Sequence, residues 1–537
     1  MRILQILAIA GVAAAFAAAI TPGTPPPQSP SSKTKPAKAK AKSTAPQKTV
    51  KKKYLSSSGM GSRGAASTSK TGTSKAGTSK AGAAKTVFAP KKPTASKAPL
   101  ASAKTTPLNS VKPAPKTLPK VSPKTPAKTP AKIQPAPAKT RVQAHEAVYR
   151  NVANGADIPV ENPAALIPFF EQLYRHQKGE MPGPVRILHY GDSHTAADEW
   201  TGEMRARLQE KFGDGGSGFS FAGRPYNGYR REDVRSGSTD GWHTDGLVGR
   251  AGDGVYGLGG ISMSVRTPRE GVYVDADASN FELFYYQQPG GGSLQLYDNG
   301  APVEKVSTDG EPSPAYYHLE DMPGPHKLEL ETLDHAPVRL FGWVAEKPTG
   351  ITYETLGING ASAPIVLDWN EETLRSNIER RNPAMIVLAY GTNEAGQKSW
   401  TLDSYRDMFE RLIARFRAAA PAATIFVIGP PDRDQKTAKK GWQPMDQLDV
   451  IVEAQREAAL ATGCPFWDQR AKMGGKGSML EWVSAGMAQT DHVHFTGPGY
   501  TMLGDAVVRD LMSQYDLFLK ARGGEVVAAQ VTPPAEP

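Results

Sequence analysis

Cysteine and long hydrophobic runs are scarce in this sequence of 537 residues. A single cysteine, Cys464, excludes an intrachain disulfide framework. Its context, ATGCPFW, is apolar and typical of a small core side chain rather than of a nucleophile. The apolar run at residues 3–16 is shorter than the about 20 apolar residues that a bilayer-spanning helix needs.

That short run has the layout of an export signal. It follows Arg2 and leads into the small residues Ala17-Ala18-Ala19. A basic start, an apolar middle and small residues at the end are typical of a removable signal peptide. We therefore expect residues 1–20 to be a signal peptide, with an uncleaved anchor as the alternative, and the protein to be exported to the periplasm or cell envelope.

Acidic residues are absent before Glu146. Residues 21–140 hold 25 of the 64 Lys and Arg residues and consist mainly of Lys, Pro, Ala, Ser and Thr, a composition that cannot form a packed core. Since Arg2 is the only other basic residue before position 141, the remainder has 38 basic against 53 acidic residues, a charge of about −15. We expect 21–140 to be a disordered arm that binds an anionic envelope polymer, the alternative being a soluble spacer; the export signal argues against nucleic acid.

Helix and strand patterns alternate in two stretches of the remaining chain. Trp200, Met204 and Leu208 recur every fourth residue, which predicts a helix. Alternation of this kind predicts a parallel sheet covered by helices on both faces. The expected helices are 163–177, 196–212, 370–381, 404–419, 446–462 and 498–520, and the expected strands are 185–190, 384–390, 423–429 and 465–469.

The segment between these stretches has β character. HKLELETL alternates apolar with polar residues, and Asn299-Gly300 is a turn signal between strand-like runs. We therefore expect a β-sandwich-like module at 241–347, inserted into one α/β domain that comprises 141–240 and 348–522. The last residues, 523–537, are expected to be a disordered tail.

Two polar segments directly follow expected strands. VRILHYGDSH stops abruptly at Gly-Asp-Ser-His, which places Ser193 at the start of a helix, and Asn393 follows the strand 384–390. Backbone N–H groups at a helix start lack intrahelical partners and can stabilise negative charge on a bound carbonyl oxygen. Ligands of open α/β sheets bind outside the carboxyl ends of strands, so we expect Ser193 and Asn393 at one edge. Taken alone, Gly-Asp-Ser is equally typical of an ordinary turn.

A third polar segment, AQTDHVHFTGPGY, precedes the last expected helix. A serine nucleophile needs a base within hydrogen-bond reach, and that base needs an orienting acceptor. Asp491 and His494 can supply both from one loop, although a single loop histidine is more often solvated or capping. His492 is two residues from His494, and we expect it to point elsewhere.

Taken together, four segments resemble in order the blocks of the GDSL or SGNH hydrolase family. The resemblance covers about 161–235 and 350–520 and implies a flavodoxin-like three-layer α/β/α fold with an inserted β-sandwich-like module. Within the family, the chain is most similar to bacterial peptidoglycan O-acetylesterases, which have GDSH, GINGA and an inserted carbohydrate-binding-like module. The blocks are Gly191-Asp192-Ser193, Gly357-Ile358-Asn359-Gly360, Gly391-Thr392-Asn393-Glu394 and Asp491-His492-Val493-His494.

The resemblance implies a role for each matching residue. Ser193 would be the nucleophile, His494 the general base and Asp491 its orienting carboxylate. The oxyanion donors would be the N–H groups of Ser193 and Gly360 and the side-chain amide of Asn393.

Four further block residues are less clearly assigned. Gly357 is the alternative oxyanion donor, and Asp192 is expected to brace the turn. The resemblance gives His194 and Glu394 no role.

We therefore expect a serine esterase that removes O-acetyl groups from an envelope polysaccharide, peptidoglycan being the expected substrate. An acetyl-Ser193 intermediate would be hydrolysed by water activated by His494, and no metal or cofactor is expected. One alternative is an O-acetyltransferase that uses the same residues with a sugar hydroxyl in place of water. The other is a non-catalytic envelope-binding protein.

Overall fold

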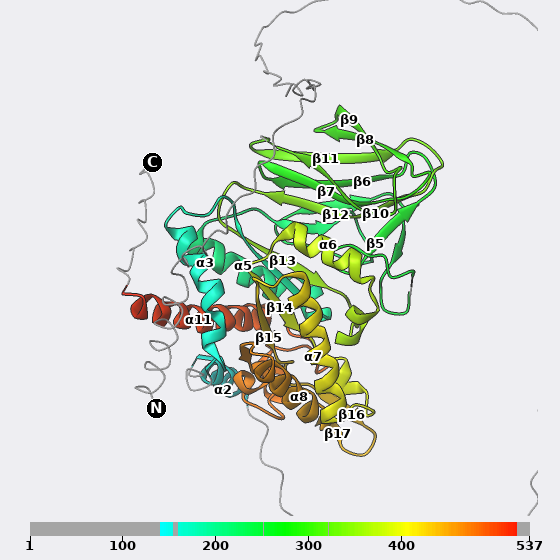
Figure 1. Ribbon diagram of the computed structural model, residues 1–537. Helices are drawn as coiled ribbons and strands as arrows, with labels where there is room; N and C mark the ends of the chain where they lie inside the picture. Colours follow the sequence, from blue (N-terminus) through cyan, green and yellow to red (C-terminus); the bar gives the residue numbers. More distant parts are fainter. Residues whose placement is uncertain (1–139, 154–158, 251, 321, 524–537) are drawn as a thin grey trace, which may run out of the picture. The chain divides into compact units, whose positions relative to one another are not determined.

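The computed structural model describes residues 140–153, 159–250, 252–320 and 322–523 (Figure 1). The expected signal peptide (1–20), arm (21–140) and tail (523–537) lie outside the described residues, except for their edge residues 140 and 523. No helix in the described part of the chain is both long and apolar enough to cross a membrane.

A parallel sheet of five strands forms the centre of the α/β part. Its order, β13-β1-β14-β15-β18, becomes 2-1-3-4-5 when these strands are numbered along the chain, which is the flavodoxin-like order. The expected flavodoxin-like fold is thereby confirmed. The strands are β1 (Val185–Gly191), β13 (Ile351–Gly357), β14 (Met385–Ala389), β15 (Thr424–Ile428) and β18 (Phe466–Trp467).

Helices cover both faces of this sheet. Successive side chains of a strand point to opposite faces, so neighbouring apolar residues of β1 pack in two different cores. Ile187 packs in one core with α3 (Ile167–Gln177), α5 (Glu199–Phe212) and α11 (Gly497–Ala521). Leu188 packs in the other core with α6 (Glu371–Arg381), α7 (Leu402–Ala419) and α8 (Gln447–Ala461). The smaller elements are α2 (Arg141–Ala153), η2 (Pro163–Leu166), α4 (Ser193–Ala196), η3 (Ala363–Asp368), η4 (Glu394–Gly396), α9 (Gln469–Met473), α10 (Met479–Ala485) and the hairpin of β16 (Asp434–Thr437) and β17 (Gly441–Pro444).

Two antiparallel sheets, with orders β10-β7-β12-β5-β4 and β3-β6-β11-β8-β9, lie between α5 and β13 in the sequence. They enclose a separate apolar core that includes Val274, Leu283 and Leu340. The strands are β2 (Gly218–Phe221), β3 (Arg235–Ser238), β4 (His243–Asp245), β5 (Ser262–Val265), β6 (Gly271–Asp277), β7 (Asn280–Gln287), β8 (Ser293–Asp298), β9 (Ala301–Ser307), β10 (Ser313–Leu319), β11 (Pro325–Thr332) and β12 (Val338–Glu346).

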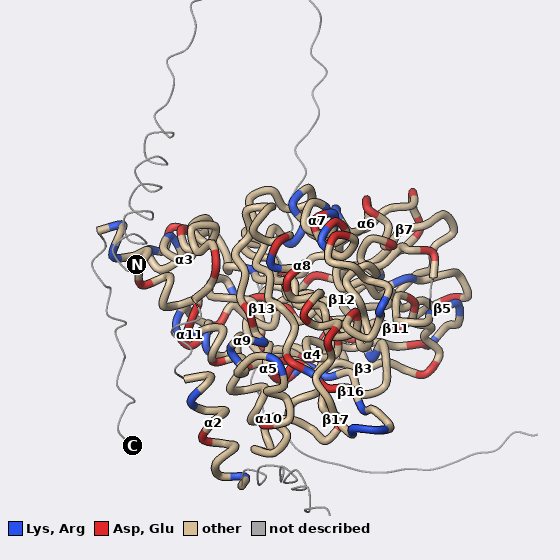
Figure 2. Tube along the Cα trace, turned by 90° about the horizontal axis from the view of Figure 1, so that it is seen from below, with Lys and Arg blue, Asp and Glu red and all other residues tan. Residues whose placement is uncertain are grey.

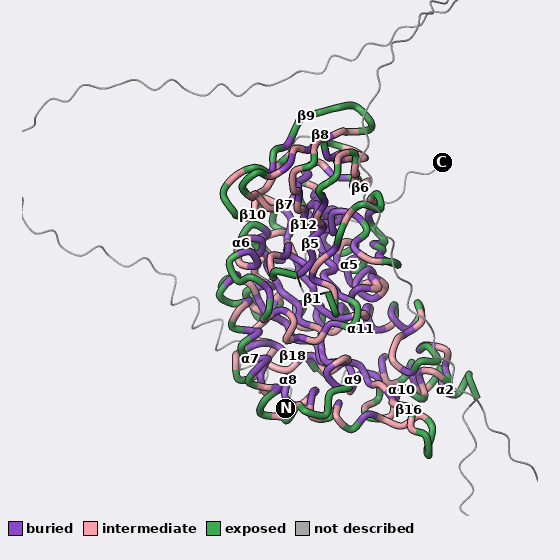
Figure 3. Tube along the Cα trace, turned by 90° about the vertical axis from the view of Figure 1, so that its right-hand side faces the viewer, coloured by how far each residue is buried: buried purple, intermediate pink, exposed green. Residues whose placement is uncertain are grey.

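The first strands of this β part differ from the expectation, which places the module at 241–347. Both β2 and β3 precede residue 241, yet β2 pairs with β12 and β3 pairs with β6. They lie in the Gly-rich stretch that follows α5, where short strands give no alternating pattern to detect. At the far end of the same sheet as β3, β9 pairs only with β8 among the described strands and forms an exposed edge (Figure 3).

The β part and the α/β part share buried contacts. Phe284 and Phe341 of the β part belong to the same hydrophobic core as α7. Charged pairs also join the two: Arg381 of α6 lies 2.6 Å from Glu346 at the end of β12, and Arg186 of β1 binds the same carboxylate at 2.7 Å. These pairs and the apolar contacts anchor the β part on the α/β part.

Candidate active site

The carboxyl ends of three neighbouring strands converge on the candidate site. Gly191, the last residue of β1, is opposite Gly357 of β13 on one side and Ala389 of β14 on the other. Ser193 and Asn393 follow the ends of β1 and β14 within a few residues. The register of the sheet therefore brings the Ser, Gly and Asn segments to one edge.

The turn at Ser193 differs in detail from the expected strand-turn-helix. Ser193 begins the single turn α4, and the longer helix α5 starts only after Asp198, which has a φ of 57°. The buried Asp198 carboxylate binds the Arg205 guanidinium of α5 at 2.9 Å. Asp192 caps α4, since its Oδ1 accepts the His194 N–H at 2.9 Å, so it does brace the turn. The Ser193 N–H has no acceptor in the described part of the chain.

Ser193, His494 and Asp491 form a continuous hydrogen-bonded relay. Ser193 Oγ lies 2.9 Å from His494 Nε2, and His494 Nδ1 lies 2.7 Å from Asp491 Oδ2. The other oxygen of Asp491 accepts the backbone N–H groups of Val493 and His494, both at 3.0 Å. Partial burial opposes ionisation of Asp491, but the His494 ring and these N–H groups together hold its pKa below the ordinary value. A negative Asp491 fixes the imidazole with Nε2 facing the serine.

Gly360 and Asn393 lie where donors to a bound carbonyl oxygen are needed. Gly360 is in an exposed turn with a φ of 77°, a conformation that favours glycine, and no described acceptor receives its N–H. The Asn393 amide donates one N–H to Ala361 O at 2.8 Å, which ties the two segments together and leaves its second N–H available. Gly357 is packed in the sheet, where a Cβ would lie 2.2 Å from Ala196 N. The geometry thus favours Gly360 over Gly357 as a donor.

His492 points away from Ser193 and holds the loop that carries His494. Its Nδ1 lies 2.7 Å from Asp434 Oδ2, and both side chains are buried. The Asp434 N–H donates to His492 O at 3.1 Å, and Trp442 of β17 stacks on the imidazole with ring centroids 4.0 Å apart. His492 therefore connects the His494 loop to the β16–β17 hairpin.

His194, for which the resemblance implies no role, packs directly against the relay. Its ring centroid lies 5.3 Å from that of His494, and its Nδ1 lies 3.0 Å from Tyr500 Oη. Burial lowers the pKa of His194 to about 3, so the ring is neutral near pH 7. An uncharged ring at this place supports the His494 imidazole without repelling the proton that it receives. The position next to Ser193 was the only signal for it in the sequence.

Glu394 and Arg433 hold the segments that carry Gly360 and Asn393 in place. Glu394 accepts the Ala363 N–H at 2.7 Å, the Gly391 N–H at 3.1 Å and the Tyr405 hydroxyl at 2.9 Å, which joins the Gly and Asn segments. Burial raises its pKa to about 7. Arg433 donates to Thr392 O, directly before Asn393. Sequence reasoning missed Arg433, whose only signal is its place after the strand β15.

Other groups with chemical potential lie apart from this edge. Cys464 is buried in the core with 1% of its surface exposed, and burial raises the pKa of its thiol. Within the described ranges, no three His, Cys, Asp or Glu side chains come together as metal ligands would.

The fold and the relay are those of an ester hydrolase. Residues 329–502 match the GDSL-like lipase/acylhydrolase family, so the chain carries a domain of that family. The matched range contains Gly360, Asn393, Asp491 and His494, whereas Ser193 lies before it. No curated protein sequence matches the chain.

Among solved structures, one described as a peptidoglycan O-acetylesterase in action is similar to this chain. It is 27% identical, the match covers 65% of this chain and 96% of that one, and the TM-score is 0.56. A family two carbohydrate esterase from Clostridium thermocellum also matches, with 12% identity over 48% of this chain and 95% of that one and a TM-score of 0.24. The low TM-score of the second match adds nothing on this chain's fold or activity.

Proposed function

We propose that the protein hydrolyses O-acetyl esters of a cell-envelope polysaccharide, and that peptidoglycan is this polysaccharide. The observation that carries the proposal is the relay from Ser193 through His494 to Asp491, with separations of 2.9 and 2.7 Å. A relay of this kind, next to unpaired N–H donors, is suited to acyl transfer to serine and then to water.

The expected reaction has two steps. Ser193 Oγ attacks the acetyl carbonyl while its proton passes to His494 Nε2, and the resulting oxyanion accepts hydrogen bonds from the N–H groups of Ser193 and Gly360 and the amide of Asn393. The C–O bond to the sugar then breaks, and His494 gives its proton to the departing sugar hydroxyl. In the second step His494 takes a proton from water as the water oxygen attacks the acetyl carbonyl. The bond to Ser193 Oγ then breaks, His494 returns the proton to Ser193 Oγ, and acetic acid leaves and ionises to acetate. Asp491 keeps His494 in the required tautomer in both steps.

The choice of peptidoglycan is supported by the similarity to a structure described as a peptidoglycan O-acetylesterase. The test is acetate release from isolated O-acetylated peptidoglycan, compared with acetylated xylan at equal acetyl content. We expect faster release from peptidoglycan. Faster release from xylan would overturn the substrate, and release from neither would overturn the activity. Acetyl groups found on added sugar instead of in solution would indicate transfer rather than hydrolysis.

We further propose that the protein is exported and that the basic segment 21–140 binds an anionic envelope polymer, because this segment has 25 basic and no acidic residues. Attraction of this kind weakens with salt. Deleting 21–140 should reduce salt-sensitive sedimentation with isolated cell-wall material. Equal sedimentation of both proteins at low salt would identify the segment as a spacer.

A further inference from the structure

A row of polar and aromatic side chains crosses one sheet of the β part. Arg339 of β12 is directly opposite Ser264 of β5 on one side and Tyr286 of β7 on the other, and Ser264 is opposite His243 of β4. The neighbours Met263 and Leu340 point into the apolar core, so the row lies on the opposite face. Since side chains two residues apart share a face, Arg266 and Gln288 extend the same surface beyond Ser264 and Tyr286.

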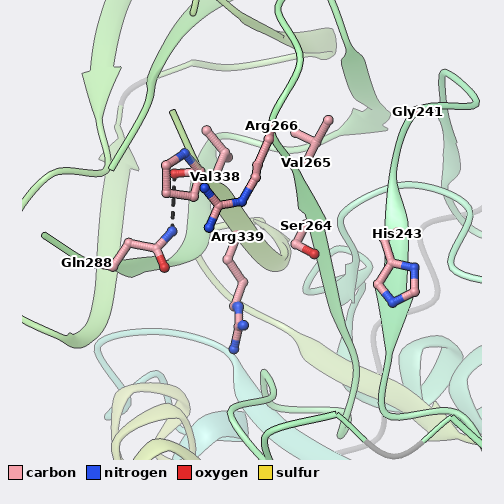
Figure 4. A pocket seen from close by; sticks show the side chains of 9 residues that line it. Gly241, His243, Ser264, Val265, Arg266, Gln288, Val338 and Arg339 are labelled. Carbon is pink, nitrogen blue, oxygen red and sulfur yellow. Dashed lines mark hydrogen bonds between the residues drawn. The ribbon is translucent and has the colours of Figure 1, made fainter. Parts of the chain in front are cut away.

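This surface encloses a cavity of about 350 Å³ (Figure 4). That size lies at the small end of the roughly 300–1,000 Å³ typical of ligand sites. Arg266 reaches from the end of β5 toward Gln288, and His243 stands on the next strand. None of the lining residues is acidic; they are Gly241, His243, Ser264, Val265, Arg266, Gln288, Pro337, Val338 and Arg339.

Arg266 is the cation of this cavity that has no counter-ion. Arg339 is paired with Asp253 at 2.9 Å, and His243 lies 3.0 Å from Asp245. Arg266 is exposed and makes no ion pair or hydrogen bond within the part of the chain that the structure describes. Over the described residues as a whole, basic and acidic residues are interspersed along the chain trace (Figure 2). An unpaired guanidinium in a cavity without carboxylates is therefore a local feature that suits an anionic group.

We propose that this cavity binds a carboxylate-bearing sugar unit. The Arg266 guanidinium can bind a carboxylate with two parallel hydrogen bonds. Ser264 and His243 offer polar groups to sugar hydroxyls, and the strands that carry them are fixed by pairing. The Gln288 amide, which donates to Pro337 O at 3.1 Å, completes one wall. The site lies on a strand face and is distinct from the strand-end site of Ser193.

The chain segment that follows β4 connects this cavity to the candidate active site. Arg339 holds Asp253 of this segment, and the Gly254 carbonyl accepts the Asn370 N–H at 2.8 Å. Val248 of the same segment lies next to Gly360: its Cγ2 is 3.9 Å from the place where a Cβ on Gly360 would be. If the protein acts on peptidoglycan, as proposed, the cavity would hold an acidic unit of the same polymer, because muramic acid units from which the peptide stem has been removed carry a free lactyl carboxylate.

The test is calorimetric binding to the full-length protein of two disaccharides that lack O-acetyl groups. N-acetylglucosaminyl-N-acetylmuramic acid has the lactyl carboxylate, and chitobiose has the same type of ring without it. We expect at least tenfold tighter binding of the acidic disaccharide, an at least tenfold loss in Arg266→Ala and a smaller loss in Arg266→Lys. Arg235→Ala removes an exposed arginine from β3 of the other sheet and is the matched control, which should bind as the unchanged protein does.

Equal binding of the two disaccharides would overturn the proposal, as would unchanged binding by a folded Arg266→Ala variant. An equal loss in Arg235→Ala would also overturn it, because the effect would then be one of overall charge. The result is separable from the proposed function. Acetate release without Arg266-dependent binding contradicts only this site, whereas Arg266-dependent binding without acetate release contradicts only the esterase activity.

Discussion

The two candidate sites of this protein are built in different ways. In the α/β part, parallel strands bring Ser193, Gly360 and Asn393 to one edge, and the loop before α11 brings His494 to Ser193. In the β part, His243, Ser264 and Arg339 stand opposite one another on adjacent strands. A strand-end site depends on loop conformation, whereas a strand-face site depends on sheet register.

This difference determines how each site responds to change. The strand-end site holds its residues through side-chain contacts between segments, such as Asn393 to Ala361 O and Glu394 to the Ala363 N–H. The strand-face site is held by the backbone ladder, so one side chain can change without moving its neighbours. We therefore expect large and cooperative losses at the first site and small, separate losses at the second.

The largest expected effect tests the strand-end site at its nucleophile. Ser193→Ala should lower turnover of an acetyl ester by a factor of about 10⁴ to 10⁶, because loss of a triad serine removes the covalent route. The fold should remain, since the hydroxyl is only partly buried in a turn. Initial rates and circular dichroism check both statements. Ser484→Ala, on α10, is the control with no expected loss; a folded Ser193→Ala enzyme that keeps several per cent of its activity would contradict the assignment.

Substitutions of His494 and His492, which lie in one loop, should affect turnover and stability differently. His494→Ala should abolish turnover with little loss of stability, because its side chain is 35% exposed. His492→Ala leaves the buried Asp434 carboxylate without its partner, which costs about 3 kcal/mol or more. We expect it to unfold at lower denaturant concentration while retaining more turnover than His494→Ala.

Denaturant unfolding and initial rates measured on both variants give the comparison. If His492→Ala is inactive while His494→Ala is active, the relay has been assigned to the wrong histidine.

Removing the Asn393 amide should have a smaller effect on the same edge. One oxyanion donor contributes about 10² to 10³ in turnover. Asn393→Ala should therefore lower kcat by this factor with little change in KM. Gln397→Ala removes an exposed amide from the same loop and should change neither value. A rise confined to the KM of Asn393→Ala would show a role in binding the ground state instead.

The strand-end site could be predicted from the sequence because its residues are contiguous with strand signals. Apolar runs that stop at Gly-Asp-Ser and Gly-Thr-Asn mark both a strand end and a polar loop, and the parallel order of strands then places them together. The triad partners Asp491 and His494 occur within one short segment. The fold class was predictable for the same reason, since long helices alternate with apolar strands.

The strand-face cavity could not be predicted, because nothing in the sequence gives the pairing of β4, β5 and β12. Arg266 and Arg339 are 73 positions apart, and each is an ordinary polar residue in its own strand pattern. The short strands β2 and β3 were missed since four residues carry too little alternation. Arg433 and the contact of His492 with Asp434 were missed for another reason. Both depend on tertiary contacts between distant segments.

Acid sensitivity should distinguish the two parts. Burial lowers the pKa of His194 to about 3, whereas an unfolded histidine titrates near 6.5. Between these values the unfolded chain binds a proton that the native chain does not, so the free energy of unfolding falls as the pH drops below about 6.5. His194→Gln should make this fall shallower, by at most about 1.4 kcal/mol per pH unit.

Denaturant unfolding from pH 7 to pH 4 measures that slope. His243→Gln, in the β part, is the matched control: its ring is 66% exposed, and the slope should not change. Equal slopes for the unchanged protein and His194→Gln would show that His194 is not the source of acid sensitivity.

The smallest expected effect lies where the two parts meet, at Val248. This side chain comes from the segment after β4, is 51% exposed and lies beside Gly360 of the α/β part. A polysaccharide bound over Ser193 would cover the Val248 side chain. Truncation to alanine would remove about half of the apolar contact between this side chain and the polymer, which costs roughly 1 kcal/mol at about 0.8 kcal/mol per CH₂ group. Val248→Ala should therefore raise the KM for acetylated polysaccharide about fivefold, with a much smaller effect on a small acetyl ester that cannot reach the segment. Val303→Ala, at a similarly exposed valine of β9, should leave both KM values unchanged. Equal effects of Val248→Ala on the two substrates would show that Val248 acts through the Gly360 turn and not through contact with the polymer.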